Sequence, residues 1–282
     1  MKFLFRHYNF FALWHPEVML LVVILLVVYF QLLGPLKNRF GDNLPPVPTM
    51  TKVYFLGALI VFYVAMGTPL KLVADEYLFS GHMVQYALLS MVMPPLLLAG
   101  IPQWMINSLW KTRFWYNVLR VATSPPFAII TFNVIFSVIE WPPFLDASLH
   151  DDWLYLLESY VMLIAAIFLW WPVMHPVLKR GDNKLKVVPR PGFLPELTMI
   201  SRGYQLVYVF FNFDLMMPAL VYIIDTAKPF YLFYVHAPRI FGISALADQQ
   251  LGVLIMGASM TVAYVSAFLA IYTKYDESHW YD

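Results

Sequence analysis

The sequence predicts an all-α polytopic membrane protein, a single domain over residues 1–282 with seven transmembrane helices in one bundle. Composition is the first indication: 61% of the residues are hydrophobic and 12% are charged, whereas soluble domains carry about 25% charged residues. The second is a series of apolar runs of about 20 residues, the length of a helix that crosses a bilayer. The third is that the polar segments between these runs are too short to form a separate soluble domain.

Charged residues bound most of these runs and divide the chain into elements. The predicted helices span residues 18–36, 53–70, 82–101, 121–139, 153–178, 203–224 and 249–273. The third contains Pro94 and Pro95, which remove two backbone donors and predict a kink. The fifth and sixth each contain one acid, Glu158 and Asp214, and the seventh begins directly after Asp248.

Basic residues predict the orientation of the bundle. Most of the 18 Lys and Arg residues fall on one side of the predicted helices, and basic loops stay in the cytoplasm. The N-terminus is therefore expected outside, the C-terminus inside, and the protein in the plasma membrane. Most histidines and many acids then gather at the outer end.

Composition also excludes several classes of function. A net charge of +1 gives no reason to expect nucleic-acid binding, and membrane lipid is the expected surrounding. The chain has no cysteine, so a soft metal would need His, Met or carboxylate ligands. Because no phosphate-binding loop, zinc-protease motif or catalytic triad is found, an enzyme is not expected.

The third helix carries the most informative polar stripe. His82, Gln85 and Tyr86 share one helix face, and Met93 continues it. One interpretation is an outward-opening pocket in which His82 binds a metal with help from Met83 or Met93. The alternative is a histidine hydrogen-bonded to a neighbouring helix, with methionines filling the core.

Other polar residues at the outer end are candidates for the same pocket. They are His15, Glu140, His150, Glu158, Asp248 and Gln249. Glu158 lies inside a membrane helix, where a carboxylate needs a partner, although it can also reach the interface. Asp248 is equally explained as a helix cap.

Asp214 is the deepest charge in the sequence. It is expected to serve as a proton relay or as a counter-charge to a buried cation. Alternatively, Asn212 and a carbonyl freed by Pro218 satisfy its protonated form.

Several short motifs resemble the CtaG family, the membrane assembly factors of caa3-type cytochrome c oxidase. They are His82-Met83-Val84-Gln85, Pro94-Pro95-Leu96-Leu97, Gly100-Ile101-Pro102, Trp170-Trp171-Pro172, Met217-Pro218 and Asp248-Gln249-Gln250-Leu251-Gly252 with Met256. The resemblance implies a non-enzymatic chaperone that works with cytochrome c oxidase subunits. The implied step is maturation of the binuclear centre, with copper delivered to the catalytic subunit.

The sequence departs from the family pattern where further histidines are common, since Tyr86, Glu140, Tyr155 and Glu158 stand there. The leading hypothesis is therefore an assembly factor that holds an unfinished oxidase subunit, or passes copper to it from a site of mixed ligands around His82, and a purely scaffolding role stays open. The proposed metal ligands of this site are His82, Met83, His15, His150 and Glu158. Two other functions stay open: a small-solute or metal-ion carrier coupled through Asp214, and a structural subunit of a respiratory complex.

Overall fold

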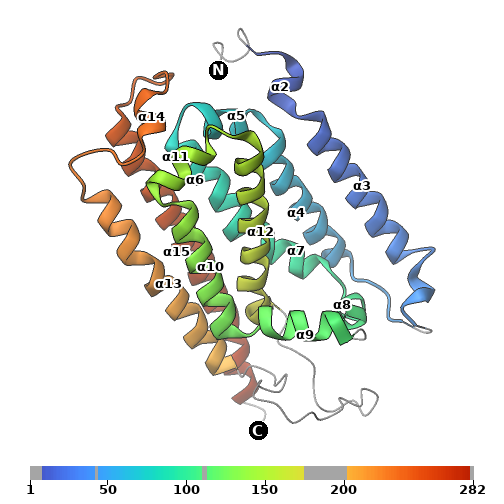
Figure 1. Ribbon diagram of the computed structural model, residues 1–282. Coiled ribbons are helices and arrows are strands. Elements are labelled where there is room, and N and C mark those ends of the chain that lie inside the picture. The colour runs from blue at the N-terminus through green and yellow to red at the C-terminus, as the bar shows by residue number, and fades with distance from the viewer. Residues whose placement is uncertain (1–7, 42–43, 110–112, 175–201, 280–282) are drawn as a thin grey trace.

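The computed structural model describes residues 8–41, 44–109, 113–174 and 202–279. Every regular element in these residues is helical, as the sequence predicts (Figure 1). Within them, six helices are long and apolar enough to cross a membrane, or seven if one bent pair counts as a single span. The predicted fold class is confirmed.

The first half of the chain forms one side of the bundle and its central helix. Its elements are α2 (Phe10–Trp14), α3 (Pro16–Leu33), the short turn η1 (Lys37–Arg39), α4 (Thr49–Gly67), α5 (Pro69–Glu76), α6 (Phe79–Ala87), the π-helical η2 (Leu88–Val92), α7 (Met93–Gly100), α8 (Gln103–Leu109) and α9 (Arg113–Ala122).

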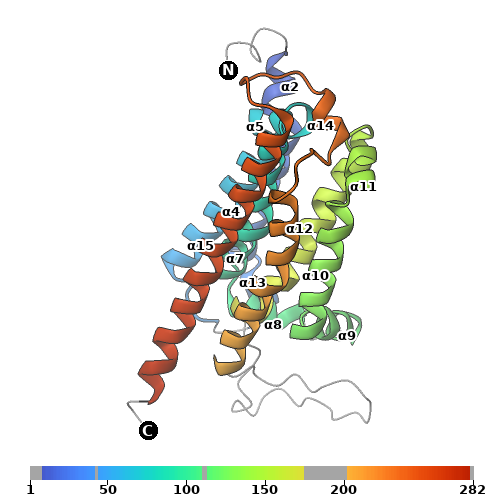
Figure 2. The same ribbon diagram turned by 90° about the vertical axis from the view of Figure 1, so that its left-hand side faces the viewer.

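The second half completes the bundle. Its elements are α10 (Pro125–Ile139), α11 (Pro142–Ser148), α12 (Asp152–Met174), α13 (Arg202–Ile224), α14 (Leu232–His236) and α15 (Ala245–His279). The ends of the described chain lie at opposite ends of the bundle (Figures 1 and 2). We call the end that carries α2, α5, α11 and α14 the outer end, following the predicted orientation.

Prolines explain most differences from the predicted helix bounds. Pro69 and Thr68 end α4 at Gly67 and start α5, where the Thr68 hydroxyl accepts from the Leu70 amide. Pro125 likewise separates α9 from α10, so residues 121–139 do not form one straight helix. The pair α10 and α11 meets at an angle of 70°. Residues 175–178 of the predicted fifth helix lie outside the described residues.

The segment α6–η2–α7 is the central helix of the bundle. It packs against α4, α12 and α15, while α3 lies at the edge against α4 (Figure 1). Pro94 has no amide proton for the carbonyl of Ser90, four residues earlier. The Trp170 indole on α12 donates to that carbonyl at 2.8 Å, so a neighbouring helix supplies the missing hydrogen bond.

Gly100, at the end of α7, allows this helix to approach α4 closely. A Cβ atom there would lie 2.5 Å from the Phe55 backbone nitrogen on α4, which is too close for any side chain. The Gly100 carbonyl also accepts from the Tyr29 hydroxyl of α3 at 2.8 Å. One small residue therefore fixes the spacing of three helices.

We expect Gly100→Ala to lower the free energy of unfolding by about 1–3 kcal/mol, because α4 and α7 must separate. Gly57→Ala is the matched control, since a Cβ at Gly57 meets only the Leu96 side chain, at 3.7 Å. Thermal unfolding in detergent compares the two variants. Equal stability of both would contradict the close approach.

Candidate functional site

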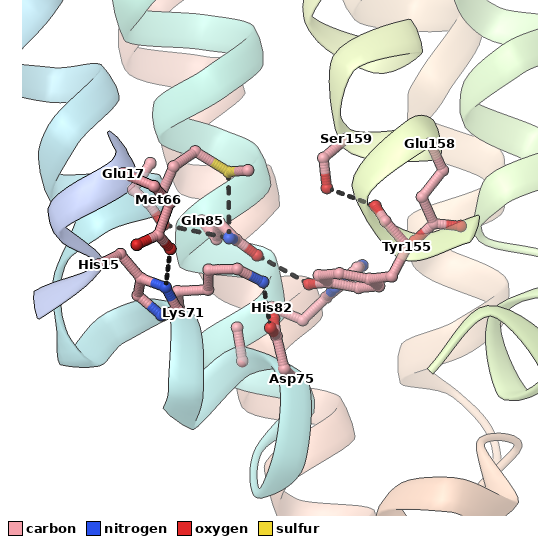
Figure 3. A network of polar contacts seen from close by, with 12 residues as sticks. His15, Glu17, Met66, Lys71, Asp75, His82, Gln85, Tyr155, Glu158 and Ser159 are labelled. Carbon is pink, nitrogen blue, oxygen red and sulfur yellow. Dashed lines mark hydrogen bonds and ion pairs between the residues drawn. The ribbon is translucent and has the colours of Figure 1, made fainter. Parts of the chain in front are cut away.

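A buried polar network surrounds His82 in the outer half of the bundle (Figure 3). His82 is 0% exposed, and both of its ring nitrogens have partners. Nε2 lies 3.2 Å from Glu140 Oε1, at the end of α10, and Nδ1 lies 3.2 Å from the Tyr155 hydroxyl of α12. The imidazole of α6 thus joins two other helices.

Gln85 determines where the protons of this network lie. Its Nε2 donates to the Ala65 carbonyl at 3.0 Å, so its Oε1 faces Tyr155 and accepts that hydroxyl at 2.8 Å. Because Tyr155 has given its only proton to Gln85, its oxygen can only accept from His82 Nδ1. Nδ1 of His82 is therefore the donor to Tyr155, and Nε2 faces the Glu140 carboxyl group.

Tyr86 and Glu158 extend the network away from Gln85. The Tyr86 ring lies 4.2 Å from the imidazole of His82, centroid to centroid, and its hydroxyl donates to Glu158 Oε1 at 3.2 Å. Among the described residues, Glu140 Oε2 and Glu158 Oε2 are buried without a hydrogen-bond partner. Unpaired buried carboxylate oxygens are costly and often mark functional sites.

Lys71 and Asp75 of α5 close the network on its outer side. They form an ion pair, and Lys71 Nζ lies 5.0 Å from the centroid of the Tyr155 ring (Figure 3). Burial raises the pKa of Asp75, while the charge of Lys71 opposes that shift. A charged pair thus lies beside the His82 network.

Asp248 and Gln249 form a separate polar group on α15. The Asp248 carboxylate accepts from the amides of Phe79 at 2.9 Å and Ser80 at 3.1 Å, so it caps α6 from another helix. Gln249 accepts from the Phe230 amide at 2.6 Å. The capping role considered for Asp248 is what the structure shows, but the donors belong to α6 and not to its own helix.

The five proposed metal ligands do not meet in one place. Among the described residues, no group of three His, Cys, Asp or Glu side chains has the arrangement of a metal site. His15 lies half-buried beside Glu17 at 2.8 Å. Met83 is buried against Gly252 of α15, and Met93 packs in the core beside α4. Only His82 and Glu158 belong to the same buried network.

A pocket of about 650 Å³ opens at the outer end, next to this network. It is lined by Glu76, Asp146, His150, Leu232, Phe233, His236, Ala237 and Pro238. His150 Nδ1 lies 2.6 Å from the Asp146 carbonyl, and His236 Nδ1 lies 2.8 Å from the Leu232 carbonyl. Since a carbonyl only accepts, Nδ1 is the donor in both rings, and the neutral form of each ring then has its lone pair on Nε2.

His236 and Asp146 were not selected by the sequence analysis, although both line this pocket. Asp146 caps α14, because its carboxylate accepts from the amides of Leu232 and Phe233 at 3.1 Å each. The signal was weak, since α14 is a five-residue helix without a measurable hydrophobic period. Only the fold brings α11 and α14 together.

Comparison with protein families gives one result. The model of the family described as cytochrome c oxidase caa3 assembly factor (Caa3_CtaG) matches residues 27–275. The chain belongs to this family. No curated protein and no solved structure matches this Caa3_CtaG member. The match confirms the resemblance, and it contains both the His82 network and the pocket but leaves out His15.

We expect Tyr155→Phe in this Caa3_CtaG protein to cost about 1–3 kcal/mol of stability, because Gln85 Oε1 and His82 Nδ1 lose their shared partner in a buried site. Tyr160→Phe is the matched control on the same helix. Thermal unfolding in detergent measures both, and an equal loss in the two variants would argue against the network.

Proposed function

We propose that the chain helps to insert copper into the catalytic subunit of a caa3-type cytochrome c oxidase, working from the outer face of the plasma membrane. The family match over residues 27–275 is the observation that carries the assembly role. Copper is the cargo in this proposal, and the chain itself catalyses no reaction.

The outer pocket supports the copper step better than His82 does. Both nitrogens of His82 are engaged, so binding a metal there would require breaking two buried hydrogen bonds. His150 and His236, in contrast, line an open pocket with free Nε2 lone pairs. Imidazole is a suitable ligand for copper. Among the described residues the pocket's His and acidic side chains do not form a three-ligand metal site, so the proposal is transient contact of copper with His150 and His236 during transfer.

The His82 network supports this function by positioning the pocket walls. Glu140, the partner of His82, precedes α11, and its carbonyl accepts from the Tyr231 hydroxyl at 3.1 Å. Tyr231 in turn precedes α14, which carries His236. Through Glu140, the buried imidazole is therefore connected to α11, which His150 follows, and to α14, which carries His236.

The placement of Asp214 disfavours the carrier alternative, which needs this carboxylate on a path through the bundle. Asp214 lies on the exposed side of α13. A structural subunit would remain in the mature oxidase at equal stoichiometry. Purification of the active oxidase and quantification of this chain separate that alternative from a transient assembly factor.

The first test is the metal content of the oxidase from a strain that lacks this gene. We expect an oxidase that retains haem but has lost copper and activity. Normal copper and haem with normal activity would contradict an assembly role. Loss of both haem and copper would support an assembly role but contradict the specific copper step.

The second test concerns the pocket. We expect the double variant His150→Ala/His236→Ala of the full chain to retain several-fold less Cu(I) than the wild type, because both imidazole donors are lost. His15→Ala is the control, since His15 lies outside this pocket. Copper stoichiometry that is unchanged in the double variant would remove the pocket from the proposal.

A further inference from the structure

One side of α13 faces away from the bundle along its whole length. The opposite side packs against α15 and contains Tyr208, Asn212, Met216 and Leu220, all buried. The outward stripe repeats with the helical period and consists of Tyr204, Val207, Phe211, Asp214, Pro218, Val221, Tyr222 and Asp225, all exposed. Figure 2 shows α13 at the surface of the bundle.

Asp214 is the charged residue in the middle of this largely apolar stripe, whose other acid, Asp225, lies beyond the end of α13. Asp214 lies near the middle of α13 (Arg202–Ile224), about 15–18 Å from either end at ~1.5 Å per residue. At that depth an exposed side chain faces hydrocarbon, and ionisable residues within membrane helices normally face protein or water. Among the described residues, no hydrogen bond or ion pair to the Asp214 side chain is found, and Asn212 instead donates to the Tyr208 carbonyl at 3.3 Å.

Pro218 adds a second unsatisfied group at the same depth. Because proline has no amide proton, the carbonyl of Asp214, four residues earlier, loses its usual helical donor. For the equivalent proline in the central helix, Pro94, the Trp170 indole replaces that donor. Hydrocarbon offers no hydrogen-bond donor in place of the missing amide. A polar partner would therefore stabilise both the carbonyl and the side chain of Asp214.

The stripe is also hollowed on the outer side of Asp214. A groove of about 590 Å³ is lined by Met217, Pro218, Val221, Tyr222, Asp225 and Thr226. At mid-membrane depth this surface therefore offers one carboxylate beside the mainly apolar inner part of a groove, while Asp225 and Thr226 line its outer end. That pattern matches a helix with one polar donor near its middle among apolar side chains.

We propose that this face of α13 docks a transmembrane helix of another membrane protein, and that a basic side chain at mid-membrane depth in that helix pairs with Asp214. Charge decides the kind of partner. In a two-fold dimer of this chain through the same face, Asp214 would meet Asp214, and two carboxyl groups in a medium of low dielectric constant cannot both be charged, so neither could form an ion pair. A partner with Lys or Arg instead neutralises the carboxylate. The inference rests on the placement of Asp214 and does not depend on the copper step.

The test uses the full chain in lipid nanodiscs and a synthetic transmembrane peptide of about 20 leucines with one central lysine. The control peptide has leucine in place of the lysine. Association is measured by resonance energy transfer between labelled chain and labelled peptide. We expect the lysine peptide to bind about fivefold to thirtyfold more tightly than the control, which is the range reported for polar contacts between membrane helices.

Three variants make the result specific. Asp214→Leu should abolish the preference for lysine, Asp214→Lys should reverse it toward a peptide with a central glutamate, and the exposed Asp152→Leu at the start of α12 should leave it unchanged. Equal binding of both peptides to the wild type would overturn the proposal, as would a preference that survives Asp214→Leu.

Two further outcomes also decide against it. If Asp214→Leu unfolds at a lower temperature than the wild type in detergent, the carboxylate has a structural partner within the chain; we expect equal or higher stability. If differently labelled copies of the chain associate with each other through Asp214, the partner is a second copy. These assays need neither copper nor oxidase, so their failure is distinguishable from failure of the assembly function.

Discussion

The bundle depends on satisfying the backbone of its central helix where that helix cannot satisfy itself. Hydrocarbon provides no hydrogen bonds, so each orphan group of α6–η2–α7 needs a neighbour. The Asp248 carboxylate of α15 accepts from the first amides of α6, and the Trp170 indole of α12 donates to the carbonyl released by Pro94. The amides at the start of α6 and the Ser90 carbonyl are thus paired by two different helices. These contacts fix the position of the helix that carries His82.

From this fixed position, His82 is connected through hydrogen bonds to residues at the outer end of the bundle. Its hydrogen bonds run to Glu140 and Tyr155, and Glu140 is the last residue before the bend into α11. The backbone of Glu140 is then tied to Tyr231, just before α14. Hydrogen bonds through Glu140 and Tyr231 therefore lead from His82 to the pocket lined by His150 and His236. In this arrangement the buried histidine lies behind the pocket, and the two exposed histidines line it.

Helix length predicted the helical membrane fold, and spacing along one helix predicted the common face of His82, Gln85 and Tyr86. Glu140 and Glu158 were candidates only as polar residues expected at the outer end, together with His15 and His150, which lie outside the network. Tyr155 was noted only as a departure from the family pattern, although it is the hydroxyl that orders the network. His236 was missed because α14 is too short to show a period. The outward direction of Asp214 was also unpredictable, since a helix that is apolar all round gives no sign of which side faces its neighbours. Residue spacing within one helix was informative, whereas contacts between helices required the fold.

The origin of the α6 cap has a consequence for biosynthesis. Asp248 lies on α15 and Trp170 lies on α12, and both helices leave the ribosome after α6 and α7. When the central helix first enters the bilayer, its leading amides and the Ser90 carbonyl have neither of these partners. Until α12 and α15 are inserted, we expect these groups to be hydrogen-bonded by the insertion machinery or by headgroup water. Asp248 of α15 thus accepts the hydrogen bonds of the first α6 amides. A chain that lacked α15 would leave these amides without that acceptor.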